Sequence, residues 1–158
     1  MTVRGGDGND TIWANKGDNI LFGDAGNDRI VGASGNDVIA GGIGNDSMHG
    51  GGGNDIFTFC DNWGTDEVEQ LPGGSVTLWF TSESKGKVAW DDGSGSYTDG
   101  TNSVTVKGVD TNQVFLKFGE NSPEDAAQFA AISAAGAFLD VTSQKIFEES
   151  GKEFLAAL

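Results

Sequence analysis

Six nine-residue units follow one another without a gap between Gly5 and Thr58. Position four of the unit is glycine in all six copies, position eight is always apolar, and position six is Asp in five copies and Asn19 in the second. A unit with one apolar side chain cannot bury a core alone, so the units must stack on one another. The six units read GGDGNDTIW, ANKGDNILF, GDAGNDRIV, GASGNDVIA, GGIGNDSMH and GGGGNDIFT.

Each unit divides into a turn and a short strand. Glycine at positions one, two and four allows positive φ angles and a tight turn, which points successive carbonyl oxygens to one side. The last three residues alternate polar, apolar and polar, which is the period of a strand. Two units carry the chain around once in 18 residues, so odd and even units stack on opposite sides at about 4.8 Å spacing. The residues at position eight then form one inward column: Ile12, Leu21, Ile30, Ile39, Met48 and Phe57.

The composition leaves this stack short of hydrophobic stabilisation and rich in negative charge. Only 37% of the residues are hydrophobic, and the formal net charge is −15, from 24 acidic and 9 basic residues. Nucleic acid and anionic membranes are therefore disfavoured as partners, and cations are favoured. No apolar run reaches the roughly 18 to 20 residues of a membrane helix, and a single cysteine, Cys60, excludes an internal disulfide. We expect bound metal to supply the missing stability and the metal-free repeats to be largely unfolded.

The repeat resembles the RTX family, the glycine-rich nonapeptide repeats of bacterial proteins exported by type I secretion. The resemblance covers Gly5–Thr58 and implies a parallel β-roll in which each calcium ion takes two carbonyl oxygens and one Asp from each of two stacked loops. On one side it implies two sites: Gly6, Gly8 and Asp10 with Gly23, Ala25 and Asp28, and Asp24, Gly26 and Asp28 with Gly41, Ile43 and Asp46. On the other side it implies two more: Asn15, Gly17 and Asn19 with Gly32, Ser34 and Asp37, and Ala33, Gly35 and Asp37 with Gly50, Gly52 and Asp55.

Three residues depart from this set or extend it. Asn19 stands where the family has Asp, and an amide oxygen can bind calcium but carries no charge, so we expect the site of Asn19 and Asp37 to be the weakest of the four. Asp61 and Asp66 fall where a seventh loop would stack on the fifth. They either close a further site or are solvated turn residues, and both alternatives stay open.

The chain divides into three segments: the roll at 1–58, a flanking strand region at 59–121 and a helical region at 122–158. Short apolar runs at 75–80, 87–90, 103–109 and 114–118 predict antiparallel strands that cap the roll, with Trp79, Phe80 and Trp90 packed inside. The fold expected is all-β, a parallel β-roll continued by a small antiparallel cap. From Ser122 the pattern predicts two helices. The family resemblance implies that the chain end holds an uncleaved signal for a type I ABC transporter complex.

No catalytic arrangement is evident, because the only histidine, His49, has no convincing partner in the sequence and Cys60 has no nearby base. The leading expectation is a secreted, extracellular calcium-binding module of a larger protein that folds on binding calcium outside the cell. The alternative is a calcium-stiffened adhesion module whose tryptophans bind a glycan or receptor. The upstream cargo cannot be inferred, since toxins, proteases, lipases and adhesins all carry such tails.

Overall fold

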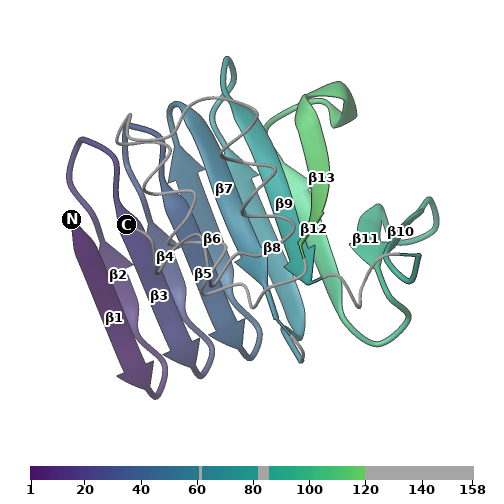
Figure 1. The fold of residues 1–158 in the computed structure, drawn as a ribbon, viewed down its shortest axis with the longest axis horizontal. Coiled ribbons are helices and arrows are strands. Elements are labelled where there is room, and N and C mark those ends of the chain that lie inside the picture. Colours follow the sequence, from purple (N-terminus) through teal and green to yellow (C-terminus); the bar gives the residue numbers. More distant parts are fainter. Residues whose placement is uncertain (61, 82–85, 120–158) are drawn as a thin grey trace.

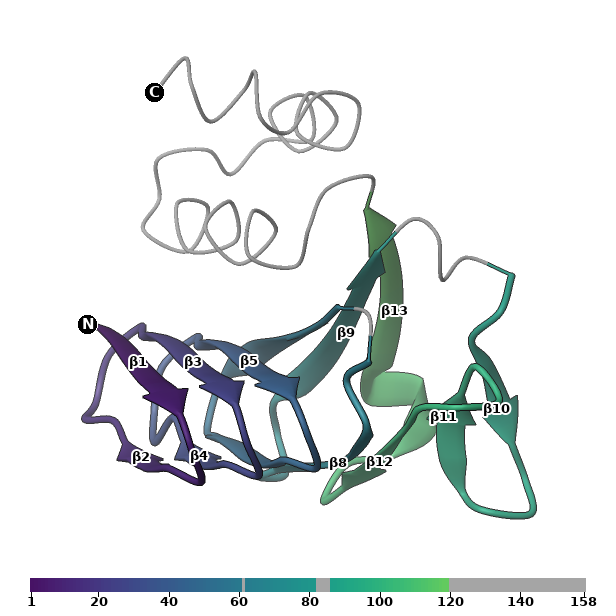
Figure 2. The ribbon, with the colours of Figure 1, turned by 90° about the horizontal axis from the view of Figure 1, so that it is seen from below.

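The computed structural model describes residues 1–60, 62–81 and 86–119, which form two sheets facing one another (Figures 1 and 2). The first sheet has the order β1-β3-β5-β7-β9-β13 and the second β10-β11-β12-β8-β6-β4-β2. The first sheet contains β1 Thr2–Asp7, β3 Ile20–Ala25, β5 Val38–Ile43, β7 Asn54–Phe59, β9 Ser75–Thr81 and β13 Val114–Gly119. The second contains β2 Thr11–Trp13, β4 Arg29–Val31, β6 Ser47–Gly51, β8 Thr65–Gln70, β10 Ala89–Asp91, β11 Ser96–Thr98 and β12 Ser103–Lys107. A 3-10 turn, η2 Thr111–Gln113, precedes β13.

The repeats form the predicted parallel roll. Ile12 of β2 pairs with Ile30 of β4, and Leu21 of β3 pairs with Ile39 of β5, in both cases across one 18-residue turn. The inward column is confirmed, since its six residues are at most 7% exposed: Ile12, Leu21, Ile30, Ile39, Met48 and Phe57. Because the strand period alternates sides, this register leaves the neighbouring positions of each strand outside the column.

The prediction of an antiparallel cap is wrong for most of its strands. β9 pairs in parallel with β7, β13 with β9, and β12 with β8, so the roll continues beyond the repeats. The offset between stacked residues grows from 18 to 20 or 21 residues, and then to 38 where the β10–β11 hairpin is inserted. Among the strands of the described residues, only the pairs β10–β11 and β11–β12 are antiparallel. Once the period lengthens, glycine spacing no longer marks the turns, although each turn still returns the chain to the same two sheets.

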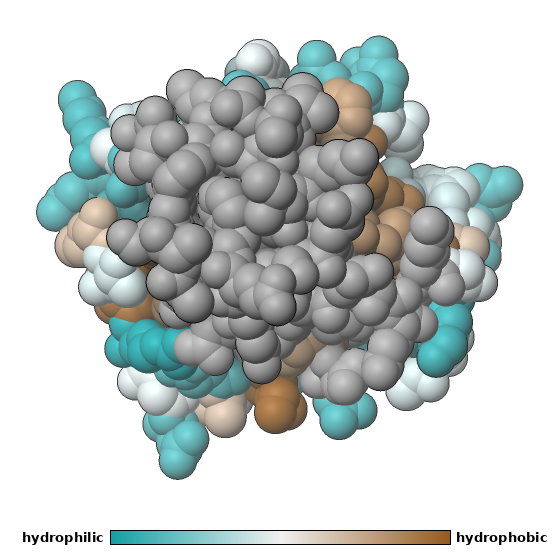
Figure 3. All heavy atoms as spheres, in the orientation of Figure 1, coloured by the Kyte–Doolittle hydropathy of each residue, from teal (hydrophilic) through white to brown (hydrophobic). Residues whose placement is uncertain are grey.

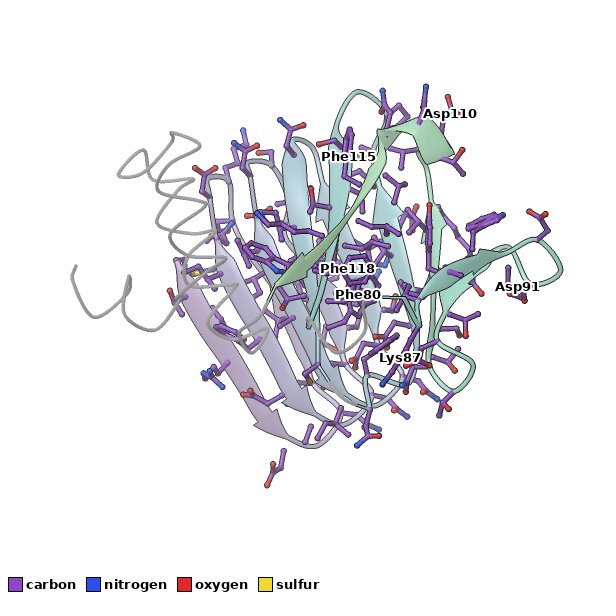
Figure 4. The ribbon with its side chains drawn as sticks, turned by 45° about the vertical axis from the view of Figure 1, so that its right-hand side comes forward. Phe80, Lys87, Asp91, Asp110, Phe115 and Phe118 are labelled. Atoms are coloured by element: carbon purple, nitrogen blue, oxygen red, sulfur yellow. The ribbon has the colours of Figure 1, made fainter. Side chains whose placement is uncertain are left out.

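An aromatic cluster fills the far end of the roll, and we define it as Phe59, Trp63, Phe80 and Phe118. Phe80 stacks on Phe59 at 5.0 Å between ring centroids. Phe80 also stacks on Phe118, at 5.7 Å between ring centroids, and both residues are labelled in Figure 4. Trp63 is 2% exposed and contacts both Phe59 and Phe80. This end of the roll is therefore held by aromatic packing, in contrast to the repeats, where each turn contributes few large side chains.

The remaining predictions for the flanking region divide between burial and exposure. Trp79 and Phe80 are buried as predicted, whereas Trp90 is 43% exposed on β10, where its ring meets Tyr97 edge-on. On the face drawn in Figure 3, hydrophilic residues lie along much of the visible rim and hydrophobic residues gather toward the side of β9 and β13. The two helices and the export signal predicted in 122–158 lie outside the described residues, as does Asp61. Within the described residues, no helix has the length and apolarity needed to span a membrane.

Candidate metal centre

Two columns of side chains run along the roll where its turns stack, one on each side. The first column is Asp10, Asp28, Asp46 and Asp66, and the second is Asn19, Asp37 and Asp55. In each column, the backbone N–H of one residue donates to the Oδ1 of the residue on the next turn, at 2.7–2.8 Å. These bonds fix the χ angles of the carboxylates and leave each Oδ2 directed into the stack.

Most of the buried side-chain oxygens that lack a hydrogen-bond partner in the described part of the chain are aspartate Oδ2 atoms. Six of them are buried without a hydrogen-bond partner among the described residues: those of Asp10, Asp28, Asp37, Asp46, Asp55 and Asp66. An unpaired buried carboxylate costs several kcal/mol, so a repeated row of them requires a compensating positive charge. The donor set is made of hard oxygen atoms, which fits calcium.

Backbone carbonyls converge on the same points. A Cβ built on Gly23 would lie within 3.0 Å of both Asp28 Oδ2 and the Gly41 carbonyl oxygen, and a Cβ on Gly32 would meet Asp37 Oδ2 and the Gly50 carbonyl oxygen in the same way. Glycine at position one is therefore needed because the Asp of its own unit and a carbonyl of the next turn occupy the space of a side chain. Each pair of oxygens belongs to one of the predicted ligand sets.

Other carbonyl oxygens that are predicted to bind the metal already accept one hydrogen bond each. The residue at position three accepts from the position-four N–H of the preceding turn, at 2.7–2.9 Å; these acceptors are Ala25, Ser34, Ile43 and Gly52, and the donors are Gly8, Gly17, Gly26 and Gly35. A carbonyl oxygen has a second lone pair, so this bond is compatible with metal binding. Position two lacks glycine in three units and carries positive φ in two of them, at 76° for Asp24 and 80° for Ala33, but not at Asn15. The turns of the third and fourth units thus have the same backbone form as those with glycine at this position.

The metal-ligating side chains are spread along the columns. No group of three or more His, Cys, Asp or Glu side chains comes together anywhere in the described residues. A cation between two turns would therefore depend on main-chain oxygens for much of its coordination, which is common for calcium. This explains why the repeat constrains glycine as strictly as aspartate.

Burial and mutual repulsion raise the pKa of the columns toward the end of the repeats. Burial is the main cause and the neighbouring carboxylate a smaller one, raising the pKa of Asp46 and of Asp55 to about 6 and that of Asp66 to about 8. The pKa values of Asp28 and Asp37 are raised for the same leading reason. Without a cation, deprotonation of the columns at neutral pH opposes folding.

A second ladder lies on the outer edge of the turns, at position five. The N–H of Asn27 donates to Asn9 Oδ1 at 2.8 Å, and that of Asn45 donates to Asn27 Oδ1 at 2.9 Å. The same bonds link Asp18, Asn36 and Asn54 on the other side. The ladders end at Thr65 and Ser75, whose N–H groups donate to Asn45 Oδ1 and Asn54 Oδ1 but whose side chains are no longer asparagine. This ladder needs no ion.

Gln70 is a candidate ligand that the repeat pattern does not reveal. Val76 stands opposite Asp55 where a further Asp would continue the second column. Gln70, 1% exposed at the end of β8, donates from Nε2 to the Gly53 carbonyl at 2.9 Å. Its Oε1 is buried without a partner and lies over Gly50 beside Asp55 Oδ2, where earlier turns have a carbonyl oxygen. No spacing rule predicts this, because Gln70 lies outside the nine-residue units.

The prediction that His49 lacks a partner is wrong. His49 Nδ1 lies 3.0 Å from Glu69 Oε2, and its Nε2 lies 3.3 Å from Ser47 Oγ. The three groups resemble a serine hydrolase arrangement but sit on an outward strand face. The Ser47 N–H is already bonded to the Asp28 carbonyl, so it cannot serve as an oxyanion donor. The arrangement is an ordinary cross-strand pair with a neighbouring hydroxyl.

Comparison with known protein families agrees with this geometry. The family model of the RTX calcium-binding nonapeptide repeat matches residues 2–30 and 22–57, in four copies. No curated protein matches the chain. RTX repeats bind calcium, their roll is a structural fold that is not typically catalytic, and proteins that contain them are typically secreted. Residues 2–57 of this chain therefore form an RTX calcium-binding domain.

Proposed function

We propose that the domain folds when calcium fills the two columns, and that it serves as the calcium-dependent folding module of an exported protein. The observation that carries this proposal is the row of buried Oδ2 atoms without a hydrogen-bond partner. Those of Asp10, Asp28 and Asp37 lie over a position-one glycine together with a carbonyl oxygen of the next turn, and that of Asp55 lies there together with Gln70 Oε1. At neutral pH these carboxylates repel one another, and cations between the turns remove that penalty. Calcium is thus a condition of the fold.

The ligand sets are those implied by the repeat, with two additions at the far end. Asp66 continues the first column, because Asp46 N–H donates to its Oδ1 at 2.8 Å and its Oδ2 is buried without a partner. We propose that Asp46 and Asp66 share an ion. On the second side, we propose that Gln70 Oε1 replaces the missing carbonyl and shares an ion with Asp55, since both oxygens lie over Gly50.

Export through a type I channel supplies a reason for coupling folding to calcium. A transported chain must be unfolded, and extracellular calcium modules bind with dissociation constants of about 0.1 to 1 mM, so their sites stay empty at the low calcium level of a cell interior. We propose that the chain crosses unfolded and folds outside, recognised by the transporter through its C-terminal segment. The aromatic cluster, which needs no ion, would provide the surface on which the repeats stack.

Circular dichroism during a calcium titration tests the proposal. The β signal should be largely absent in chelator and appear with calcium, with a midpoint in the range of about 0.1 to 1 mM. Asp28→Asn should raise the midpoint more than Asp10→Asn, because Asp28 belongs to two ligand sets and Asp10 to one. Asp7→Asn is the matched control, since Asp7 is exposed and belongs to none. A full β signal in chelator would sink the coupling of folding to calcium.

The exposed Trp90 favours a second candidate function, a surface that binds a glycan. Its ring is 43% exposed, and its Nε1 donates to Asp92 Oδ1 at 2.6 Å, an arrangement of aromatic face and carboxylate that suits a sugar. Trp79 cannot share this role because it is buried. A glycan array probed with the wild type and with Trp90→Ala decides the matter: binding that requires both calcium and Trp90 would support the adhesion module.

A further inference from the structure

We propose that the second repeat unit binds no calcium, and that the side-chain amide of Asn19 takes the place of the ion between its turn and the turn of Asp37. This inference rests on the proposed calcium function, since it concerns which of the implied sites are filled. It changes the expectation that the site of Asn19 is merely the weakest. Two observations carry it, one on Asn19 and one on Ala14.

The Asn19 amide donates to the atoms that would bind the ion. Its Nδ2 lies 2.9 Å from the Asn15 carbonyl oxygen, 2.7 Å from that of Gly17 and 3.4 Å from that of Gly32. It also lies 2.9 Å from Asp37 Oδ1. Asn15, Gly17, Gly32 and Asp37 are four of the six residues of the ligand set implied for this position.

If the amide were turned the other way, Oδ1 would face three carbonyl oxygens and a carboxylate, all of which are acceptors. That orientation would be stable only with a cation bound between these oxygens. With Nδ2 inward, two amide hydrogens supply the positive charge density instead, and Asn19, 3% exposed, is buried with its donors engaged. The turn then closes by hydrogen bonding alone.

The residue at position one of the same unit, Ala14, supports the same inference. In the other five units position one is glycine, and a Cβ built there would lie within 3.0 Å of the Oδ2 of the Asp five residues later; these glycines are Gly5, Gly23, Gly32, Gly41 and Gly50. The second unit has Ala14 at position one, and it is the only unit with Asn at position six. A real Cβ thus occurs only where the carboxylate that it would obstruct is missing. The two departures are complementary, and together they remove the site.

In the folded roll, the turn of Asn19 is therefore fixed to the next turn without an ion between them. Asn19 N–H donates to Asp37 Oδ1 at 2.8 Å in addition to the amide contacts, so five hydrogen bonds join or order the two turns. On the other side, Asp10 and Asp28 have no such amide and depend on an ion. The two sides of the roll thus differ in calcium occupancy at the same end.

Restoring the consensus tests the proposal. Native mass spectrometry at saturating calcium should count one more ion in Ala14→Gly/Asn19→Asp than in the wild type, because the double variant regains both the carboxylate and the space for it. Asn19→Asp alone should gain less, since Ala14 obstructs its Oδ2. Asn36→Asp is the control: it adds the same charge at position five, where the side chain is exposed, and should leave the count unchanged.

Equal ion counts in the wild type and the double variant would overturn the proposal, because the site would then already be filled. A wild type that binds no calcium would instead refute the proposed function, so the two failures are distinct. Side-chain amide NMR of the calcium-loaded wild type decides the case even where the double variant fails to fold. The Asn19 amide protons should exchange slowly, whereas fast exchange would show the amide turned outward and Oδ1 on an ion.

Discussion

Gly26→Ala should disrupt the calcium response far more than Gly8→Ala, although both glycines occupy position four with positive φ, at 135° and 108°. Alanine in this region of φ costs about 1 to 3 kcal/mol at either position. The difference lies in what stacks below. A Cβ on Gly8 has nothing within 4 Å, whereas a Cβ on Gly26 would lie within 3.0 Å of the Gly8 carbonyl oxygen and carbon.

The magnitude follows from the displacement required. Ordinary contact begins at 3.4 Å, so the turn of Gly26 must move by on the order of 1 Å, which is several times the tolerance of about 0.2 Å for a metal–ligand distance. Overpacking adds about 2 kcal/mol to the strain of about 2 kcal/mol. Spread over about four ions bound in one transition, at about 1.4 kcal/mol per tenfold change, these losses raise the calcium midpoint about 2-fold in Gly8→Ala and about 5-fold in Gly26→Ala.

Calcium titrations followed by circular dichroism and by calorimetry measure the calcium midpoint of each variant and the cooperativity of its binding. The Gly26 variant should also lose cooperativity, because the Gly8 and Gly26 carbonyls belong to consecutive ligand sets of the first side. Gly8→Ala supplies the correction for backbone strain alone. Indistinguishable midpoints in the two variants would refute the reasoning, since they would show that the close approach of the turns does not govern calcium binding.

Three further predictions concern pH, the inward column and the outer ladder. The pKa of Asp55 is raised from 3.8 to about 6, so the folded state without calcium binds a proton more tightly than the unfolded chain; its stability should fall as pH rises through this window. Circular dichroism in chelator should therefore show more β structure at pH 4 than at pH 8, while calcium affinity changes in the opposite direction. Ile39→Ala should lower the unfolding free energy in calcium by about 2 to 5 kcal/mol, since Ile39 is 0% exposed, and thermal unfolding at fixed calcium checks it; a loss below 1 kcal/mol would contradict a packed column. Asn36→Ala should cost about 0.5 to 1.5 kcal/mol by removing the acceptor of the Asn54 N–H, without changing the number of ions counted by native mass spectrometry.

The repeat unit predicts the roll because its two periods agree. The glycines place a turn every nine residues and position eight places one apolar residue inward, so the register of Ile12 on Ile30 and of Leu21 on Ile39 could be derived without coordinates. The direction of the later strands could not be derived in this way. Short apolar runs separated by turns are typical of antiparallel hairpins. The parallel stacking of β13 on β9 depends on a 38-residue offset that no repeat in the sequence indicates.

The site shows the same division. Position six predicts the columns of carboxylates, since each Asp recurs at a fixed register and its Oδ2 can only point into the stack. Gln70 could not be found in this way, because its side chain enters the second column from a residue aligned with Gly51 and not with Asp55. The hydrogen bonds of Asn19 Nδ2 likewise depend on the positions of three carbonyls, which a one-letter code does not contain.

The two ladders run in opposite directions along the roll. Each Asp Oδ1 accepts from the turn before it, whereas each position-five Asn Oδ1 accepts from the turn after it. A complete 18-residue turn inserted between two existing ones would renew both kinds of bond and keep Asp66 and Gln70 above their own columns. A nine-residue insertion would exchange the sides and set Gln70 above the column that Asp66 now continues. The length of such a roll can therefore change only by whole turns. An evolutionary or engineered change of length that keeps its end intact must add or remove nine-residue units in pairs.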